Sequence, residues 1–114
     1  MADPVQPVDV VVVTVVGDDR DVLGAIAGAA IDARLAACGQ VGGPVTSVYR
    51  WEGAAETAEE WTLTLKTAAD RTDELVALVV DRHPYDVPEV LVAPLAGGHA
   101  PYLDWVRAET RPAR

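Results

Sequence analysis

Phenylalanine and asparagine are absent from this chain of 114 residues, and cysteine, serine and lysine occur once each, as Cys38, Ser47 and Lys66. A single cysteine excludes an intrachain disulfide and any zinc site built from paired cysteines. A single serine, placed inside a predicted strand, leaves no nucleophile elbow for serine catalysis. No apolar run approaches the ~20 residues that a membrane-spanning helix requires. These absences argue against a disulfide scaffold, a serine hydrolase and a transmembrane protein.

Basic side chains are also scarce. The chain has 18 acidic and 9 basic residues, which gives a formal net charge of −9. This balance disfavours nucleic acid as a partner, because binding to phosphates depends on clustered lysine and arginine. Residues 1–7 lack the basic segment of a signal peptide and show no periodic pattern, so we predict a disordered tail there. We expect residues 8–114 to form one domain of a cytoplasmic protein with no membrane partner.

Hydrophobic periodicity predicts alternating strands and helices in the rest of the chain. Residues 8–16 are nearly continuous β-branched side chains, which is typical of a strand buried on both faces. Apolar residues then recur at helical spacing over 21–37, with Asp18 or Asp21 as the cap and Cys38-Gly39 as the end. The predicted elements are a strand at 8–16, a helix at 21–37, strands at 41–51 and 59–67, a helix at 70–82 capped by Asp70, a strand at 87–94 and a helix at 101–110. This β-α-β-β-α-β order with a C-terminal helix predicts an α+β, ferredoxin-like fold.

The second and third predicted strands form a long hairpin, bent at Gly42-Gly43-Pro44. In so small a domain such a hairpin outreaches the sheet, and unpaired strand edges are usually covered by another chain. Trp51 and Trp61 lie near the hairpin tip and would be exposed in a monomer. We therefore expect a homo-oligomer with closed symmetry.

The segment His83-Pro84-Tyr85-Asp86-Val87-Pro88-Glu89 predicts a rigid loop, because each proline fixes its own φ and disfavours helix in the residue before it. His83 is either a metal ligand or cleft residue, or a cap that bonds its own last helical turn. Asp86 is favoured as an Asx-type turn and has a second interpretation as a ligand. Glu89 precedes a strand, so it is expected either to bind a metal or to pair with Lys66 or Arg50.

Six segments of the chain resemble the CutA divalent-cation tolerance family, in the family's order and at its spacing. They are Val12–Thr14, Arg34–Cys38, Thr46–Gly53, Leu65–Thr67, His83–Glu89 and Tyr102–Trp105. The resemblance implies a tight homotrimer, similar in architecture to the PII signalling proteins, and a link to tolerance of copper and other divalent metals. The chain departs from the family at Gly39, where asparagine or valine is common, at the extended Gly42-Gly43-Pro44 bulge, and in lacking the additional cysteines of some members.

The cofactor that the resemblance implies is a divalent metal ion, copper(II) in particular. The metal ligands that we predict are Cys38, His83 and Glu89, which are widely separated in the sequence. Cys38 has the alternative of being a buried small hydrophobe, since free cysteine is among the most buried residue types.

A second set of residues could instead line a ligand-binding cleft between subunits. It consists of Tyr49, Arg50, Trp51, Lys66, Tyr85, Asp86 and Trp105. Lys66 would bind an anion or remain an ordinary solvated lysine, and the aromatic residues would line the cleft or simply pack in the core or an interface. The alternatives to a metal-binding protein are therefore a PII-like sensor of a small molecule or anion and a structural trimeric scaffold. No nucleophile–base pair is evident, so we predict that the protein is not an enzyme.

Overall fold

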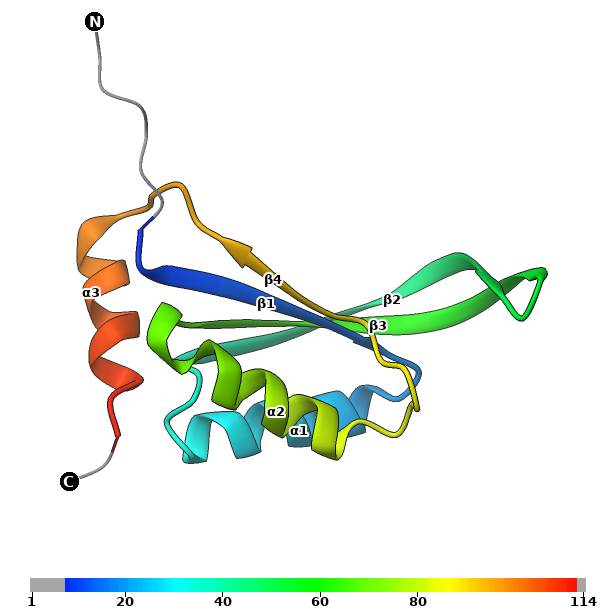
Figure 1. Ribbon diagram of the computed structural model, residues 1–114, viewed down its shortest axis with the longest axis horizontal. Coiled ribbons are helices and arrows are strands. Elements are labelled where there is room, and N and C mark those ends of the chain that lie inside the picture. The colour runs from blue at the N-terminus through cyan, green and yellow to red at the C-terminus, as the bar shows by residue number, and fades with distance from the viewer. Residues whose placement is uncertain (1–7, 113–114) are drawn as a thin grey trace, which may run out of the picture.

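Within residues 8–112, four antiparallel strands form one sheet in the order β2-β3-β1-β4, and three helices pack against it (Figure 1). The computed structural model describes these residues, and the tail predicted for residues 1–7 lies outside them. The predicted ferredoxin-like order with a terminal helix is confirmed. The elements are β1 (Val10–Gly17), α1 (Arg20–Asp32), β2 (Cys38–Trp51), β3 (Ala54–Ala68), a 3₁₀ turn (Ala69–Arg71), α2 (Thr72–Arg82), β4 (Val90–Pro94) and α3 (Ala100–Glu109).

Helix α1 begins and ends at other residues than predicted. Its N-cap is Asp19, whose carboxylate accepts hydrogen bonds from the backbone N–H groups of Asp21 (2.9 Å) and Val22 (3.2 Å). The helix ends at Asp32 because Arg34 adopts a left-handed φ of 57°, after which the N–H of Leu35 bonds back to Ala30. Cys38 consequently begins β2 and does not lie at a helix C-terminus, so the expectation that Cys38-Gly39 ends the helix is wrong.

The predicted cap of α2 is also wrong. Residues Ala69–Arg71 form a 3₁₀ turn, and Arg71 occupies the N-cap position of α2 without a side-chain bond to the helix. Asp70 instead accepts hydrogen bonds from Arg111, 41 residues later, just beyond α3. A long-range ion pair therefore takes the carboxylate that local sequence would assign to the helix.

The core lies on one face of the sheet, beneath α1 and α2. Alternate residues Val11, Val13 and Val15 of β1 point into this core, whereas Val12, Thr14 and Val16 on the other face are only half-buried. The expectation of a first strand buried on both faces is therefore wrong for most of β1. Helix α3 covers only one end of that second face, where a small cluster forms from Val10, Leu103 and Val106 (Figure 1).

A β-bulge divides the long hairpin between Gly42 and Val45, so the predicted bend is confirmed. Strand pairing shifts there from Gly42↔Thr62 to Val45↔Glu60. Gly43 has φ +131°, and a Cβ on it would come within 3.0 Å of Trp61 Cδ1, so this position requires glycine. Beyond the bulge, residues 45–60 project from the sheet, and we call this segment the hairpin arm (Figure 1).

The two tryptophans of the hairpin have different surroundings. Trp51 lies on the arm and is 48% exposed, as predicted. Trp61 pairs with Gly17 of β1 and packs against the core, so the prediction that it is exposed is wrong. The strands also differ from prediction at their ends: β2 and β3 begin earlier, at Cys38 and Ala54, and β4 begins at Val90 and not at residue 87.

Candidate functional site: an acidic aromatic cleft

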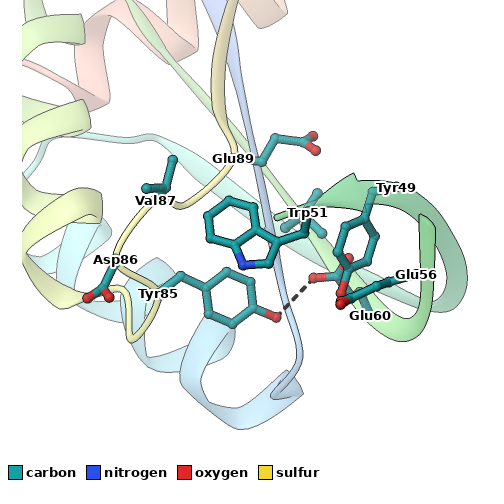
Figure 2. Close-up of a pocket in the computed structure, with 9 residues that line it drawn as sticks. Tyr49, Trp51, Glu56, Glu60, Tyr85, Asp86, Val87 and Glu89 are labelled. Carbon is teal, nitrogen blue, oxygen red and sulfur yellow. Dashed lines mark hydrogen bonds between the residues drawn. The ribbon is translucent and has the colours of Figure 1, made fainter. Parts of the chain in front are cut away.

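A cleft of about 450 Å³ separates the hairpin arm from the loop that joins α2 to β4 (Figure 2). We call it the arm cleft. A volume in this range is typical of a site for a small molecule. The residues that line it are Val16, Tyr49, Trp51, Glu56, Glu60, Tyr85, Asp86, Val87 and Glu89.

The β-bulge decides which side chains of the arm face this cleft. Because pairing slips by one residue at the bulge, the odd-numbered residues of β2 lie beside the even-numbered residues of β3 beyond it. Tyr49 pairs directly with Glu56, and Trp51 lies on the same face. Without the slip, Arg50 would occupy that face and place a positive charge in the cleft.

The arm and the loop are joined across the cleft by one hydrogen bond. The Tyr85 hydroxyl donates to Glu60 Oε2 over 2.9 Å (Figure 2). Burial and the adjacent Glu60 carboxylate raise the pKa of Tyr85 well above its usual value, so the phenol keeps its proton and remains a donor. Glu60 is 8% exposed, which is unusual for a carboxylate.

His83 fixes the start of the loop. The Tyr85 N–H donates to Nδ1 over 3.1 Å, which assigns the ring proton to Nε2, and Nε2 then donates to the Val16 carbonyl over 2.8 Å. His83 is the C-cap residue of α2, but its ring bonds β1 and the loop and not its own helix. With both nitrogens engaged and 7% of the residue exposed, His83 positions the Tyr85 wall of the cleft.

All the charged side chains that line the arm cleft are acidic, namely Glu56, Glu60, Asp86 and Glu89. The neighbouring Tyr49 phenol has a raised pKa. Desolvation is the larger cause, and the negative charge of Glu56 is the next. Lys66 and Arg50, the partners expected for Glu89, contact other groups: Lys66 Nζ bonds Gln40 Oε1, and Arg50 Nη1 bonds the Gly53 carbonyl over 3.4 Å. The cleft therefore favours positively charged ligands.

Of the predicted metal ligands, Cys38 lies apart from the other two, whereas His83 and Glu89 both bond the backbone of Val16. Cys38 pairs with Lys66, which pairs with Val12, whereas Glu89 bonds the backbone of Val16. Val12 and Val16 are four residues apart on β1, which is ~13 Å along a strand. Cys38 lies beside α3, where burial, with the thiol as a further cause, raises the pKa of Tyr102. In the part of the chain that the structure describes, no three His, Cys, Asp or Glu side chains are grouped to hold a metal ion.

The structure brings together four of the seven residues predicted for a cleft: Tyr49, Trp51, Tyr85 and Asp86. Arg50 lies at the hairpin tip, Lys66 on the sheet face opposite the main core, and Trp105 on α3. The ring centroids of Trp105 and Tyr102 are 5.6 Å apart, with the rings tilted by 37°. Sequence reasoning missed the acidic wall, Glu56 and Glu60. The signal that could have found it is the Gly-Gly-Pro bulge, since counting pairs outward from it gives the Tyr49↔Glu56 register.

Comparison of the chain with known proteins identifies its family. The family model described as CutA1 divalent ion tolerance protein matches residues 10–109, which include both walls of the arm cleft. The chain belongs to this CutA1 family. The resemblance inferred from six short segments is thereby confirmed.

Relatives within the CutA1 family differ in length. The divalent-cation tolerance protein CutA of Thermus thermophilus is 39% identical over 102 residues, which cover 90% of this chain and 97% of that protein. The chloroplastic protein CutA 1 of Oryza sativa subsp. japonica is 42% identical over 86 residues, which cover 75% of this chain and 49% of that protein, so this chain matches about half of its rice relative. A crystal structure of CutA1 from Oryza sativa has a TM-score of 0.87 at 37% identity, with 94% of this chain and 98% of that one covered.

Proposed function

We propose that this protein binds divalent cations, copper(II) among them, and contributes to tolerance of such metals. The observation that carries the proposal is the arm cleft, whose charged lining consists entirely of carboxylates. Carboxylate oxygens bind divalent ions, and a recess lined by one sign of charge concentrates counter-ions. The proposal is also supported by the names of the relatives, which describe divalent-cation tolerance proteins.

We further propose that the metal-binding form is a homotrimer, because the ligands of one described subunit do not suffice for a closed site. Two features support an assembly. Leu91, on the sheet face opposite α1 and α2, is 58% exposed, and Val48, on the arm, is 74% exposed.

The trimer is tested by light scattering at micromolar concentration. We expect a mass of about 36 kDa, three times the 12.0 kDa of one chain. A mass near 12 kDa would contradict the assembly and would leave the apolar side chains of the arm uncovered in solution.

The metal proposal is tested by calorimetric titration with copper(II), zinc and magnesium at 0.15 M salt. We expect saturable copper(II) binding below 1 μM, which corresponds to at least ~8 kcal/mol, at one ion per subunit. Glu89→Gln should weaken it, whereas Glu59→Gln, at an exposed position outside the cleft lining, should not.

A Cys38→Ser variant determines whether the thiol of the predicted ligand set takes part. Weak binding that does not saturate and is equal in all variants would mean that only the diffuse charge of −9 attracts the metal, and would refute the proposal.

The alternative of an anion sensor has less support, since Lys66, Arg50 and His83 point to separate partners and the charged lining of the cleft is acidic. We propose no catalytic role, in keeping with the description of the family as tolerance proteins. Among residues 8–112, no helix is long and apolar enough to cross a membrane. We propose a cytoplasmic location, which is consistent with a single unpaired cysteine and is testable by cell fractionation.

A further inference from the structure

The arm cleft contains more than negative charge. Three aromatic side chains line it: Tyr49 and Trp51 from the arm, and Tyr85 from the opposite loop (Figure 2). The face of an aromatic ring attracts cations through its quadrupole, and tryptophan does so most strongly. Rings and carboxylates around one space form the combination that recognises organic ammonium ions, because the rings contact the alkyl groups while the carboxylates balance the charge.

Glu60 is the second feature that suits this space to a cation. It is 8% exposed, and the Tyr85 hydroxyl is the hydrogen-bond donor found for its side chain. None of the four ion pairs found within residues 8–112 includes it. A buried carboxylate without a positive partner is costly, so a site that keeps one is suited to a cation that arrives from outside.

Within one subunit, the geometry of this cleft suits an organic cation better than a bare metal ion. In Figure 2 the carboxylates of Glu60, Asp86 and Glu89 point in different directions, and no three of the described acidic groups converge as metal ligands would. The space of about 450 Å³ is also far larger than a metal ion requires. We propose that the arm cleft binds a small alkylammonium cation, held against the Trp51 ring with Glu60 as its counter-ion. The same cleft carries the metal proposal, in which neighbouring subunits complete the metal site, and the experiments below score the two ligands separately.

The inference is tested by calorimetry on the intact protein at 0.15 M salt, with EDTA present so that metal binding plays no part. The probes are tetramethylammonium and n-butylammonium, and the neutral comparator is tert-butanol, which matches tetramethylammonium in size. We expect saturable binding of an ammonium probe with a dissociation constant of about 1 mM or lower, and at least tenfold weaker binding of the alcohol. Equal binding of the alcohol, or no saturation by either cation up to ~50 mM, overturns the inference.

Paired variants then locate the site. Trp51→Leu should weaken ammonium binding roughly three- to thirtyfold, whereas Trp105→Leu, at a tryptophan of similar exposure on α3, should leave it unchanged. Glu60→Gln should weaken binding and Glu59→Gln should not. If Glu60→Gln does not fold, as judged by circular dichroism, Glu56→Gln at an exposed position replaces it. Equal affinities across both pairs overturn the inference, and copper(II) binding in EDTA-free buffer is scored separately.

Discussion

His83 provides the sharpest test of how the cleft is built, because replacing it by alanine should destabilise the protein in the absence of any metal. The ring accepts from the Tyr85 N–H and donates to the Val16 carbonyl, and the residue is 7% exposed. His83→Ala leaves both backbone groups without their partners, at about 1–3 kcal/mol each. Part of this cost is recovered if water enters, and part is added by the lost packing, so we expect a total loss of roughly 2–5 kcal/mol.

The assay is urea unfolding in EDTA at a fixed protomer concentration, since the stability of an oligomer depends on concentration. His99→Ala is the matched control, because this second histidine is exposed and its side chain forms no capping hydrogen bond at α3; its effect should stay within ~0.5 kcal/mol. The reasoning is refuted if His83→Ala unfolds like the wild type in EDTA and differs only when metal is added. That result would make His83 a metal ligand and not the anchor of the loop.

Three further predictions concern other parts of the molecule. Gly43→Ala should cost about 1–3 kcal/mol in chemical unfolding, because a Cβ at φ +131° meets Trp61 at 3.0 Å; an unchanged midpoint would show that the bulge relaxes freely. Asp70→Asn should make the free energy of unfolding depend less steeply on pH below about pH 4, since the hydrogen bond from Arg111 lowers the pKa of Asp70 in the folded state. The ionised Asp70 stabilises the wild type above the pKa that Asp70 has in the unfolded chain, and this stabilisation is lost as pH falls through the lower pKa of the folded state. Identical acid-unfolding profiles for the wild type and Asp70→Asn would contradict the prediction. In an alkaline absorbance titration, Tyr85→Phe should remove the last phenol to ionise, because burial and Glu60 raise the pKa of Tyr85; loss of an earlier transition instead would contradict this assignment.

Local sequence predicted the order of elements well because each element carries its own periodicity. The β-branched run of β1 and the proline-bounded loop at 83–89 are readable without tertiary information. The end of α1 could not be predicted in this way, because residues 33–37 continue an alanine-rich helical pattern. The chain leaves the helix at Arg34, and Leu35 and Ala36 are buried in the core. Burial of those two side chains outweighs the high helix propensity of the alanine, arginine and leucine residues in the segment.

The candidate site was only partly predictable for a related reason. The aromatic residues of the cleft and Asp86 stand in recognisable segments, whereas Glu56 and Glu60 look like ordinary surface acids of a strand. Their neighbours in the cleft depend on a one-residue slip of register in β2, which brings Tyr49 and Trp51 to the face of these two carboxylates. The long-range bonds were equally hidden, since Arg107 and its partner Asp9 are 98 residues apart in the chain.

The sequence by itself determined the ferredoxin-like order, the family and the acidic character of the protein, because these follow from short periodic patterns, motifs and composition. Only the tertiary structure decided that Cys38 lies apart from His83 and Glu89, and that His83 is an anchor whose two ring nitrogens are occupied. It alone assembled the rings of Tyr49, Trp51 and Tyr85 with their carboxylates. The physical reason is that such encounters depend on strand register and on contacts between distant segments, which local preferences do not encode.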